Sequence, residues 1–123
     1  MTKRIVLGSV CVIISVLLSI SGWLYMKSAG NSLISSAEAA LQSGEDTFLE
    51  KAGRAVEEWE KREKIVGVIV KHEDADNVDK LYLGLKYSIY EKDFELTADY
   101  LRQCITEIKV ILTGEKPGWE NVF

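Results

Sequence analysis

The sequence is poor in the residues that build covalent or metal-based frameworks. Its 123 residues include two cysteines, one histidine and one proline. Cys11 lies in an apolar segment and Cys104 lies far along the polar part, so we expect no disulfide between them. Each cysteine is expected to pack as a small apolar side chain. One histidine without a cysteine pair also falls short of the usual ligand sets for zinc.

Catalytic and phosphate-binding motifs are absent as well. The chain contains no G-x-S-x-G, C-x-x-C or H-E-x-x-H sequence and no phosphate-cradling glycine loop. His72-Glu73 is followed by Asp76 at the position where H-E-x-x-H requires a second histidine. We therefore predict that the protein is not an enzyme and that it holds no cofactor.

Charge is absent from one long stretch. The segment Ile5–Met26, IVLGSVCVIISVLLSISGWLYM, contains 22 residues and no charged side chain. A helix of that length rises about 33 Å, which is enough to cross a hydrocarbon core of about 30 Å. The hydrophobic region of a cleaved signal peptide is shorter, about 7–15 residues. We therefore predict an uncleaved signal-anchor, with a transmembrane helix over 5–26 that contacts the lipid bilayer and Trp23 and Tyr25 as interfacial aromatics.

The flanking charges predict an orientation for this single-pass membrane protein. Lys3 and Arg4 precede the apolar segment, and only Lys27 follows it before Lys51. The positive-inside rule then makes residues 1–4 a cytoplasmic tail and places the C-terminal domain on the extracytoplasmic face of the cell membrane. The chain after Met26 carries 13 basic and 19 acidic residues, a net charge of −6. Because such a domain is repelled by phosphate groups, we expect no nucleic-acid partner.

The remaining chain follows helical periodicity and predicts an all-α fold. We expect a juxtamembrane connection over 27–31, a small antiparallel bundle of three to four helices over 32–113, and a C-terminal tail over 114–123. The first bundle helix, from about 32 to 43, either follows a break or continues the membrane helix. Apolar residues recur at helical spacing in the later helices, as in Phe48, Ala52, Trp59, Val66, Val78, Tyr82, Leu85, Leu101, Ile105 and Ile108.

Small polar residues mark the expected helix ends. Gly44 suits the end of the first bundle helix, and Asp46 or Thr47 is expected to cap the second. Asp74 or Asp76 is a candidate cap for the third helix. Asp93, in the tight connection Glu91-Lys92-Asp93, is expected to cap the fourth.

The densest polar cluster is the segment 72–79, HEDADNVD. On a continuous helix, His72, Asp76 and Asp79 would share one stripe at positions i, i+4 and i+7, a spacing that could hold a divalent metal. Our main interpretation is an elbow between helices, in which carboxylates cap backbone N–H groups and His72 bonds to a neighbour. A contact surface for a partner is the second. A metal site is the third, with His72, Glu73, Asp76 and Asp79 as its candidate ligands.

Aromatic residues supply further candidates for contacts. Trp59 lies on an apolar stripe, so core packing is expected. Trp119 and Phe123 lie outside any stripe, and either pack back on the bundle or contact a partner or the bilayer surface. The candidate partner contacts are Trp59, His72, Glu73, Trp119, Asn121 and Phe123.

In combination these features resemble the domain-of-unknown-function family 4363, small single-pass membrane proteins of endospore-forming Gram-positive bacteria. The resemblance rests on the N-terminal anchor, on Trp59-Glu60-Lys61, on His72-Glu73 followed by Val78-Asp79, and on the closing Glu120-Asn121-Val122-Phe123. Asp74-Ala75 replaces the acidic-aliphatic pair usual in that family, which weakens the carry-over of any role to that position. The resemblance implies a membrane-anchored helical protein without a particular activity.

We therefore predict a membrane-anchored, non-enzymatic helical interaction or accessory protein at the extracytoplasmic face. Since a tail of four residues cannot carry a signalling domain, it would act through another membrane or envelope protein, or through a second copy of itself. The alternative is a small extracytoplasmic metal- or ligand-binding sensor or enzyme centred on His72, Glu73, Asp76 and Asp79.

Overall fold

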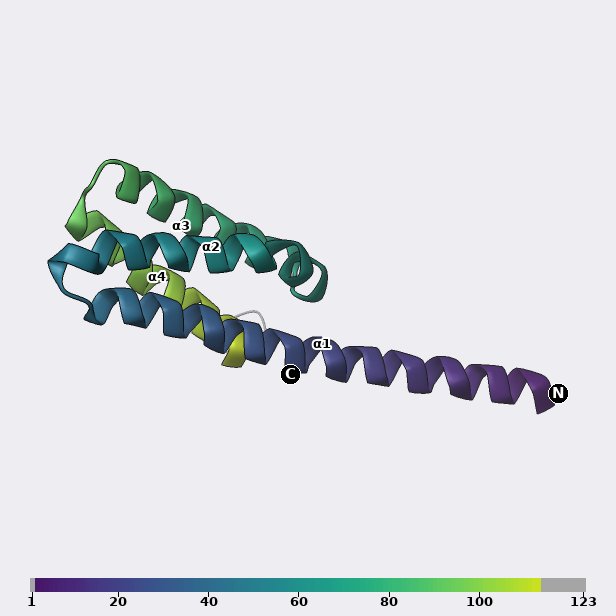
Figure 1. Cartoon of the computed structure of the whole chain (residues 1–123). Coiled ribbons are helices and arrows are strands. Elements are labelled where there is room, and N and C mark those ends of the chain that lie inside the picture. The colour runs from purple at the N-terminus through teal and green to yellow at the C-terminus, as the bar shows by residue number, and fades with distance from the viewer. Residues whose placement is uncertain (1, 114–123) are drawn as a thin grey trace.

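The computed structural model describes residues 2–113, which form four helices and no strand (Figure 1). The helices are α1 (Thr2–Gln42), α2 (Glu45–Ile69), α3 (His72–Tyr90) and α4 (Phe94–Thr113). The predicted all-α class is therefore confirmed. The predicted tail over 114–123, with the candidate contacts Trp119, Asn121 and Phe123, lies outside the described residues.

Helix α1 is one unbroken helix of 41 residues, about 60 Å long. The residues expected to form a juxtamembrane connection, 27–31, are helical, so the first bundle helix continues the predicted transmembrane helix. Gly30 does not act as a hinge in this stretch. A Cβ added there would lie 2.8 Å from Cδ1 of Leu112, so the missing side chain lets α4 approach α1 closely.

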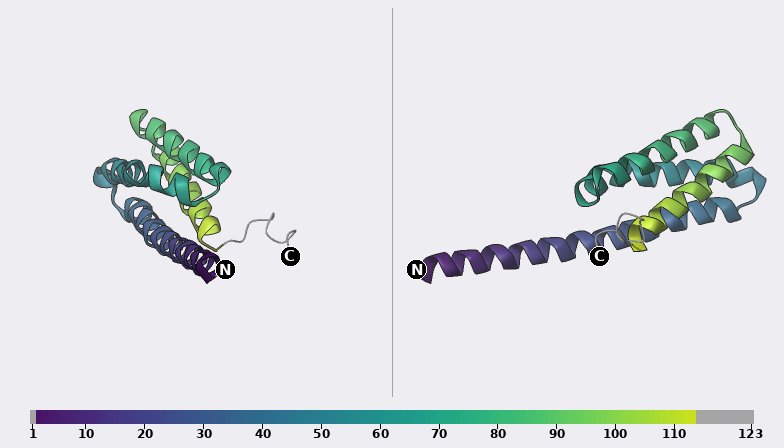
Figure 2. Two further views of the ribbon diagram at one scale, coloured as in Figure 1. Left: turned by 90° about the vertical axis from the view of Figure 1, so that its right-hand side faces the viewer. Right: turned by 180° about the vertical axis from the view of Figure 1, so that it is seen from behind.

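The two halves of α1 have different surroundings. From Thr2 to Ser21 every residue is exposed, and the helix is apolar and long enough to span a membrane. From Met26 onward, residues at spacings of three or four are buried, namely Met26, Ala29, Leu33, Ala37 and Ala40. Figures 1 and 2 show the first half projecting beyond the other helices. The bundle therefore covers the end of the predicted span and leaves about 20 residues bare.

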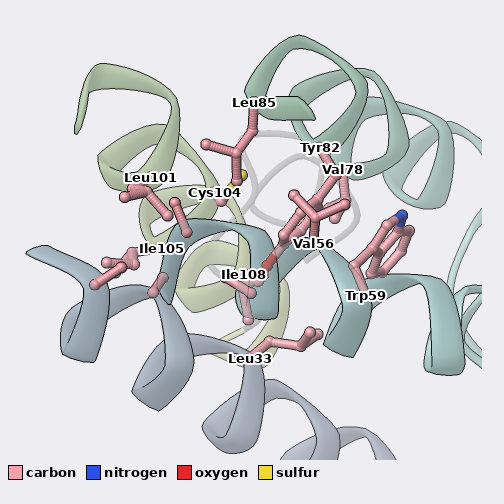
Figure 3. Packing of buried hydrophobic residues seen from close by; sticks show 14 of the residues in the cluster. Leu33, Val56, Trp59, Val78, Tyr82, Leu85, Leu101, Cys104, Ile105 and Ile108 are labelled. Carbon is pink, nitrogen blue, oxygen red and sulfur yellow. The ribbon is translucent and has the colours of Figure 1, made fainter. Parts of the chain in front are cut away.

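Helices α2, α3 and α4 fold back on the second half of α1 through short connections (Figure 2). Helix α2 packs against α1 and α3, and α4 packs against α3 and α1. The second half of α1 and the three later helices thus form a closed bundle. Its largest fully buried apolar side chains, several of which appear in Figure 3, are Tyr82, Leu33, Leu85, Leu101, Ile108, Val66 and Val78.

The expected start of α2 is wrong by two to three residues. Gly44 is the N-cap, with an extended backbone (φ −72°), and no side chain caps the helix. Asp46 and Thr47 therefore lie within the first turn. The carboxylates of Glu45 and Asp46 still favour this helix end, because they face the positive end of the helix dipole.

The expected start of α3 is also wrong. The helix begins at His72, and its N-cap Lys71 makes no side-chain capping bond. Asp74 and Asp76 consequently lie inside the helix instead of preceding it. The elbow between α2 and α3 is reduced to Val70 and Lys71, because the acidic side chains favour the first helical turn by the same dipole effect.

The turn between α3 and α4 follows the expected tight connection. Lys92 has a left-handed backbone (φ 57°), which a glycine adopts more readily. The N–H groups of Lys92 and Asp93 donate to the carbonyls of Ile89 and Ser88 at 3.0 and 3.1 Å, as in a Schellman motif. Asp93 Oδ1 accepts the N–H of Leu96 at 3.1 Å, which confirms Asp93 as the cap of α4.

Replacing Lys92 with glycine is expected to stabilise the bundle. The left-handed backbone carries a steric cost of about 1 kcal/mol for a residue with a Cβ, so Lys92→Gly should raise the free energy of unfolding by about that amount. Urea denaturation of the full chain in mild detergent measures this. Lys92→Ala is the matched control, because it removes the same charge and keeps the Cβ. Equal stabilities of the two variants would contradict the prediction.

Candidate functional site

The side chains of the predicted metal cluster do not converge on one point, because His72 pairs with Asp76 while Asp79 bonds to Trp59. Nε2 of His72 lies 3.2 Å from Oδ2 of Asp76, and the two side chains are 89% and 53% exposed. Asp79, three residues further on, does not join them, because its Oδ1 accepts a hydrogen bond from Nε1 of Trp59 at 3.1 Å. Among residues 2–113, no group of three or more His, Cys, Asp or Glu side chains is placed to share a metal ion.

The remaining candidate contacts in this region differ in accessibility. His72 and Glu73 are exposed at the start of α3, whereas Trp59 is only 2% exposed. The expected core packing of Trp59 is therefore confirmed, and little of its side chain is left for contact with a partner. His72 bonds to a neighbouring side chain as the elbow interpretation expects, but the carboxylates do not cap the helix from outside.

A stack of two aromatic rings joins α2 to α3. The rings of Trp59 and Tyr82 are nearly parallel, at 6°, with their centroids 5.2 Å apart (Figure 3). The hydrogen bond from Trp59 to Asp79 holds the indole in this orientation. Asp79 lies on α3, one turn before Tyr82. The stack and the bond together set the register between the two helices.

A groove of about 580 Å³ lies along this pair of helices. Lys86 Nζ and Glu60 Oε1 approach to 3.2 Å across it, which links α3 to α2. Its lining combines the aromatic pair with charged side chains of both signs, namely Val56, Trp59, Glu60, Glu63, Lys64, Asp79, Tyr82, Leu83 and Lys86. Sequence reasoning missed this groove, since its two walls meet only when α2 and α3 pack.

The interior beneath the groove contains two neutral acids. The hydroxyl of Tyr82 points into the bundle (Figure 3) and has no hydrogen-bond partner among the described residues. Burial, with smaller contributions from Cys104 and Glu58, raises the pKa of Tyr82 far above its ordinary value. Cys104 on α4 is fully buried, and burial raises the pKa of its thiol to about 12. Neither group is therefore ionised near neutral pH.

Both cysteines are free, as expected. The core packing expected for Cys104 is confirmed, whereas Cys11 lies exposed on the bare half of α1.

A half-buried arginine connects α2 to α1 near the bare half of α1. Nε of Arg62 donates to Oε2 of Glu58 at 3.2 Å, and the guanidinium also bonds to Tyr25 of α1. Burial lowers the pKa of Arg62, but its contacts with Glu58 and Tyr25 more than compensate and raise it overall. Arg62 thus stays charged. Its ion pair with Glu58 places charged side chains on the bundle beside Tyr25, close to the end of the apolar segment.

Comparison with protein-family models, with curated proteins and with solved structures finds no match to this chain. The resemblance to family 4363 therefore rests on the short motifs named above and stays a prediction.

The buried thiol of Cys104 predicts an alkaline loss of stability. A free cysteine loses its proton near pH 8.5, whereas the folded protein keeps this proton up to about pH 12. Between these values the folded state binds more protons, so the free energy of unfolding must fall as pH rises, with a slope approaching about 1.4 kcal/mol per pH unit.

Urea denaturation from pH 8 to 10 measures this slope. Cys104→Ala should flatten it, while Cys11→Ser should leave it unchanged, because Cys11 lies exposed outside the bundle. An unchanged slope in Cys104→Ala would show that other groups cause the pH dependence.

Proposed function

We propose that this protein is a membrane-anchored, non-enzymatic interaction or accessory protein whose bundle stands on the extracytoplasmic face of the cell membrane. The observation that carries the proposal is the contrast between the two halves of α1. Its first half, Thr2 to Ser21, carries no charge after Arg4 and is mostly apolar, and no other part of the described chain covers it. A bare apolar helix of this length is costly in water and is accommodated by a bilayer.

The continuity of α1 supports a role based on position. Since the helix runs from the apolar segment into the core of the bundle, the bundle is attached without a flexible linker. Its height and tilt relative to the membrane then follow from those of α1. Such an attachment suits a protein that presents a surface at a constant distance from the bilayer.

An exposed stripe on α3 supports contact with another protein. Leu83, Tyr87 and Tyr90, at positions i, i+4 and i+7, are 59%, 62% and 83% exposed. Tyrosine is enriched in protein interfaces because it buries a large apolar ring and keeps a polar hydroxyl. Leu83 also lines the groove between α2 and α3, so the stripe and the groove form one continuous surface. We propose a membrane or envelope protein, or a second copy of this chain, as the partner.

The alternative, a metal- or ligand-binding sensor or enzyme, starts from the contact between His72 and Asp76. Protein metal sites usually need three or more ligands, and the bond to Trp59 draws Asp79 away from the pair. A bound metal that is lost when His72 and Asp76 are both changed to alanine would support this alternative against the interaction proposal.

The anchor and its direction can be tested by cysteine labelling in intact cells. In a Cys11→Ser background, Tyr90→Cys should react with a membrane-impermeant maleimide before lysis, because Tyr90 is exposed on the bundle. Thr2→Cys, at the other end of α1, should react only after lysis. The reverse pattern would overturn the orientation. Recovery of the chain in the supernatant after a carbonate wash would overturn the anchor itself.

The interaction proposal can be tested by photo-crosslinking in native membranes. A photoreactive residue at Tyr87 should give a covalent product larger than the monomer, because Tyr87 is exposed on the proposed contact stripe. The same residue at Gln103, exposed on α4, is the control and should give at least severalfold less product. Monomer alone from Tyr87, or equal products from the two sites, would contradict the proposal.

A further inference from the structure

The elbow between α2 and α3 lies beside the end of the bare half of α1 (Figures 1 and 2). Ile69, the last residue of α2, shows where the elbow lies along α1. It approaches Gly22 closely, since a Cβ added at Gly22 would lie 3.7 Å from Cγ2 of Ile69. Since α1 is continuous from Thr2 to Gln42, the elbow has one definite level along the helix. That level falls inside the apolar segment Ile5–Met26.

The dimensions of a bilayer bring this level to the membrane boundary. From Ile5 to Gly22 the helix rises about 26 Å, which is less than the hydrocarbon thickness of about 30 Å. A tilted helix needs still more residues to cross, so tilting moves the boundary further toward the bundle. A helix that spans the bilayer from Ile5 therefore brings the elbow to the far edge of the hydrocarbon core.

The side chains next to Gly22 agree with this boundary. Trp23 is 57% exposed, and Nζ of Lys27 lies 5.3 Å from the centre of the Trp23 ring. A tryptophan at the edge of the apolar segment with a lysine one turn further on is typical of an interfacial anchor, in which the ammonium group reaches the headgroups.

The last turns of α2, which lead into the elbow, carry an apolar surface at this level. Ile65 and Val68, one turn apart, are 49% and 85% exposed. The exterior of α2 is densely charged up to Lys64, and residues 65–70, IVGVIV, are then uncharged before Lys71. We call residues 65–70 the apolar elbow. Lysines at both of its ends suit a segment that touches acyl chains while its flanks remain among headgroups.

We propose that the apolar elbow is a second membrane contact, in which Ile65 and Val68 enter the headgroup and acyl-chain boundary of the leaflet on the domain's side. This inference rests on the proposed function, because it requires α1 to span the bilayer. Two contacts fix the tilt of α1, because tilting toward the opposite side would lift the apolar elbow out of the boundary. The stripe of Leu83, Tyr87 and Tyr90 then keeps one direction relative to the membrane as well as one height.

Depth-dependent fluorescence quenching tests the apolar elbow in the full chain. The protein, with Cys11→Ser, is reconstituted into phosphatidylcholine vesicles, and a single introduced cysteine carries an environment-sensitive fluorophore. The three sites are Val68→Cys, Tyr90→Cys as a control of nearly equal exposure (83% against 85%), and Val16→Cys within the predicted span. The native Cys104 is fully buried and is not available to the reagent. Lipids with a quencher near the headgroup or deep in the acyl chain report depth.

We expect the shallow quencher to quench the Val68 label severalfold more strongly than the Tyr90 label. The deep quencher should quench the Val16 label. Quenching at Val16 without quenching at Val68 would overturn the elbow contact and leave the anchor intact. Equal quenching at Val68 and Tyr90 would also overturn it, because the whole bundle would then lie on the surface. No quenching at Val16 would overturn the anchor, and the elbow contact with it.

Discussion

The structure depends on the continuity of α1, which is a bare apolar helix in its first half and one wall of a packed bundle in its second. A helix that is apolar on all sides needs an apolar environment on all sides, whereas a helix with one apolar stripe buries that stripe against other helices. The change from one pattern to the other occurs near Met26, within a single helix. The position of the bundle relative to the bare apolar half is therefore set by α1 itself.

The contact between α1 and α4 permits this continuity. Gly30 would be an easy place for the chain to bend, because glycine loses more conformational freedom in a helix than any other residue. Here its surface is covered by Leu112, so α4 packs directly on the helix at the point where a connection was expected. The same contact places the end of α4 on the side of the bundle that faces the bare half of α1.

The arrangement of α2 and α3 changes the interpretation of the acidic segment. On sequence alone, three side chains of α3 share a stripe, and a metal site is a reasonable hypothesis. When α2 packs on α3, the third of them, Asp79, accepts a hydrogen bond from the indole of Trp59. Without Asp79, the buried indole N–H would lack an acceptor. The bond between Trp59 and Asp79 therefore helps to set the register of α2 against α3, beside the charged groove. The more exposed pair of His72 and Asp76 lies apart from it, at the start of α3.

Several features followed from the sequence because they depend on local chemistry. The helical class, the length of the apolar segment, the cap at Asp93 and the burial of Trp59 are set by periodicity and by the properties of single side chains. The starts of α2 and α3 were missed, because each helix begins before the carboxylates that were expected to cap it, and Gly44 and Lys71 precede them as N-caps. The contacts of Gly30 and Asp79 were decided only by tertiary structure, because each is made with a residue of another helix. The level of the elbow at Gly22 was decided in the same way, by the length over which α2 packs along α1.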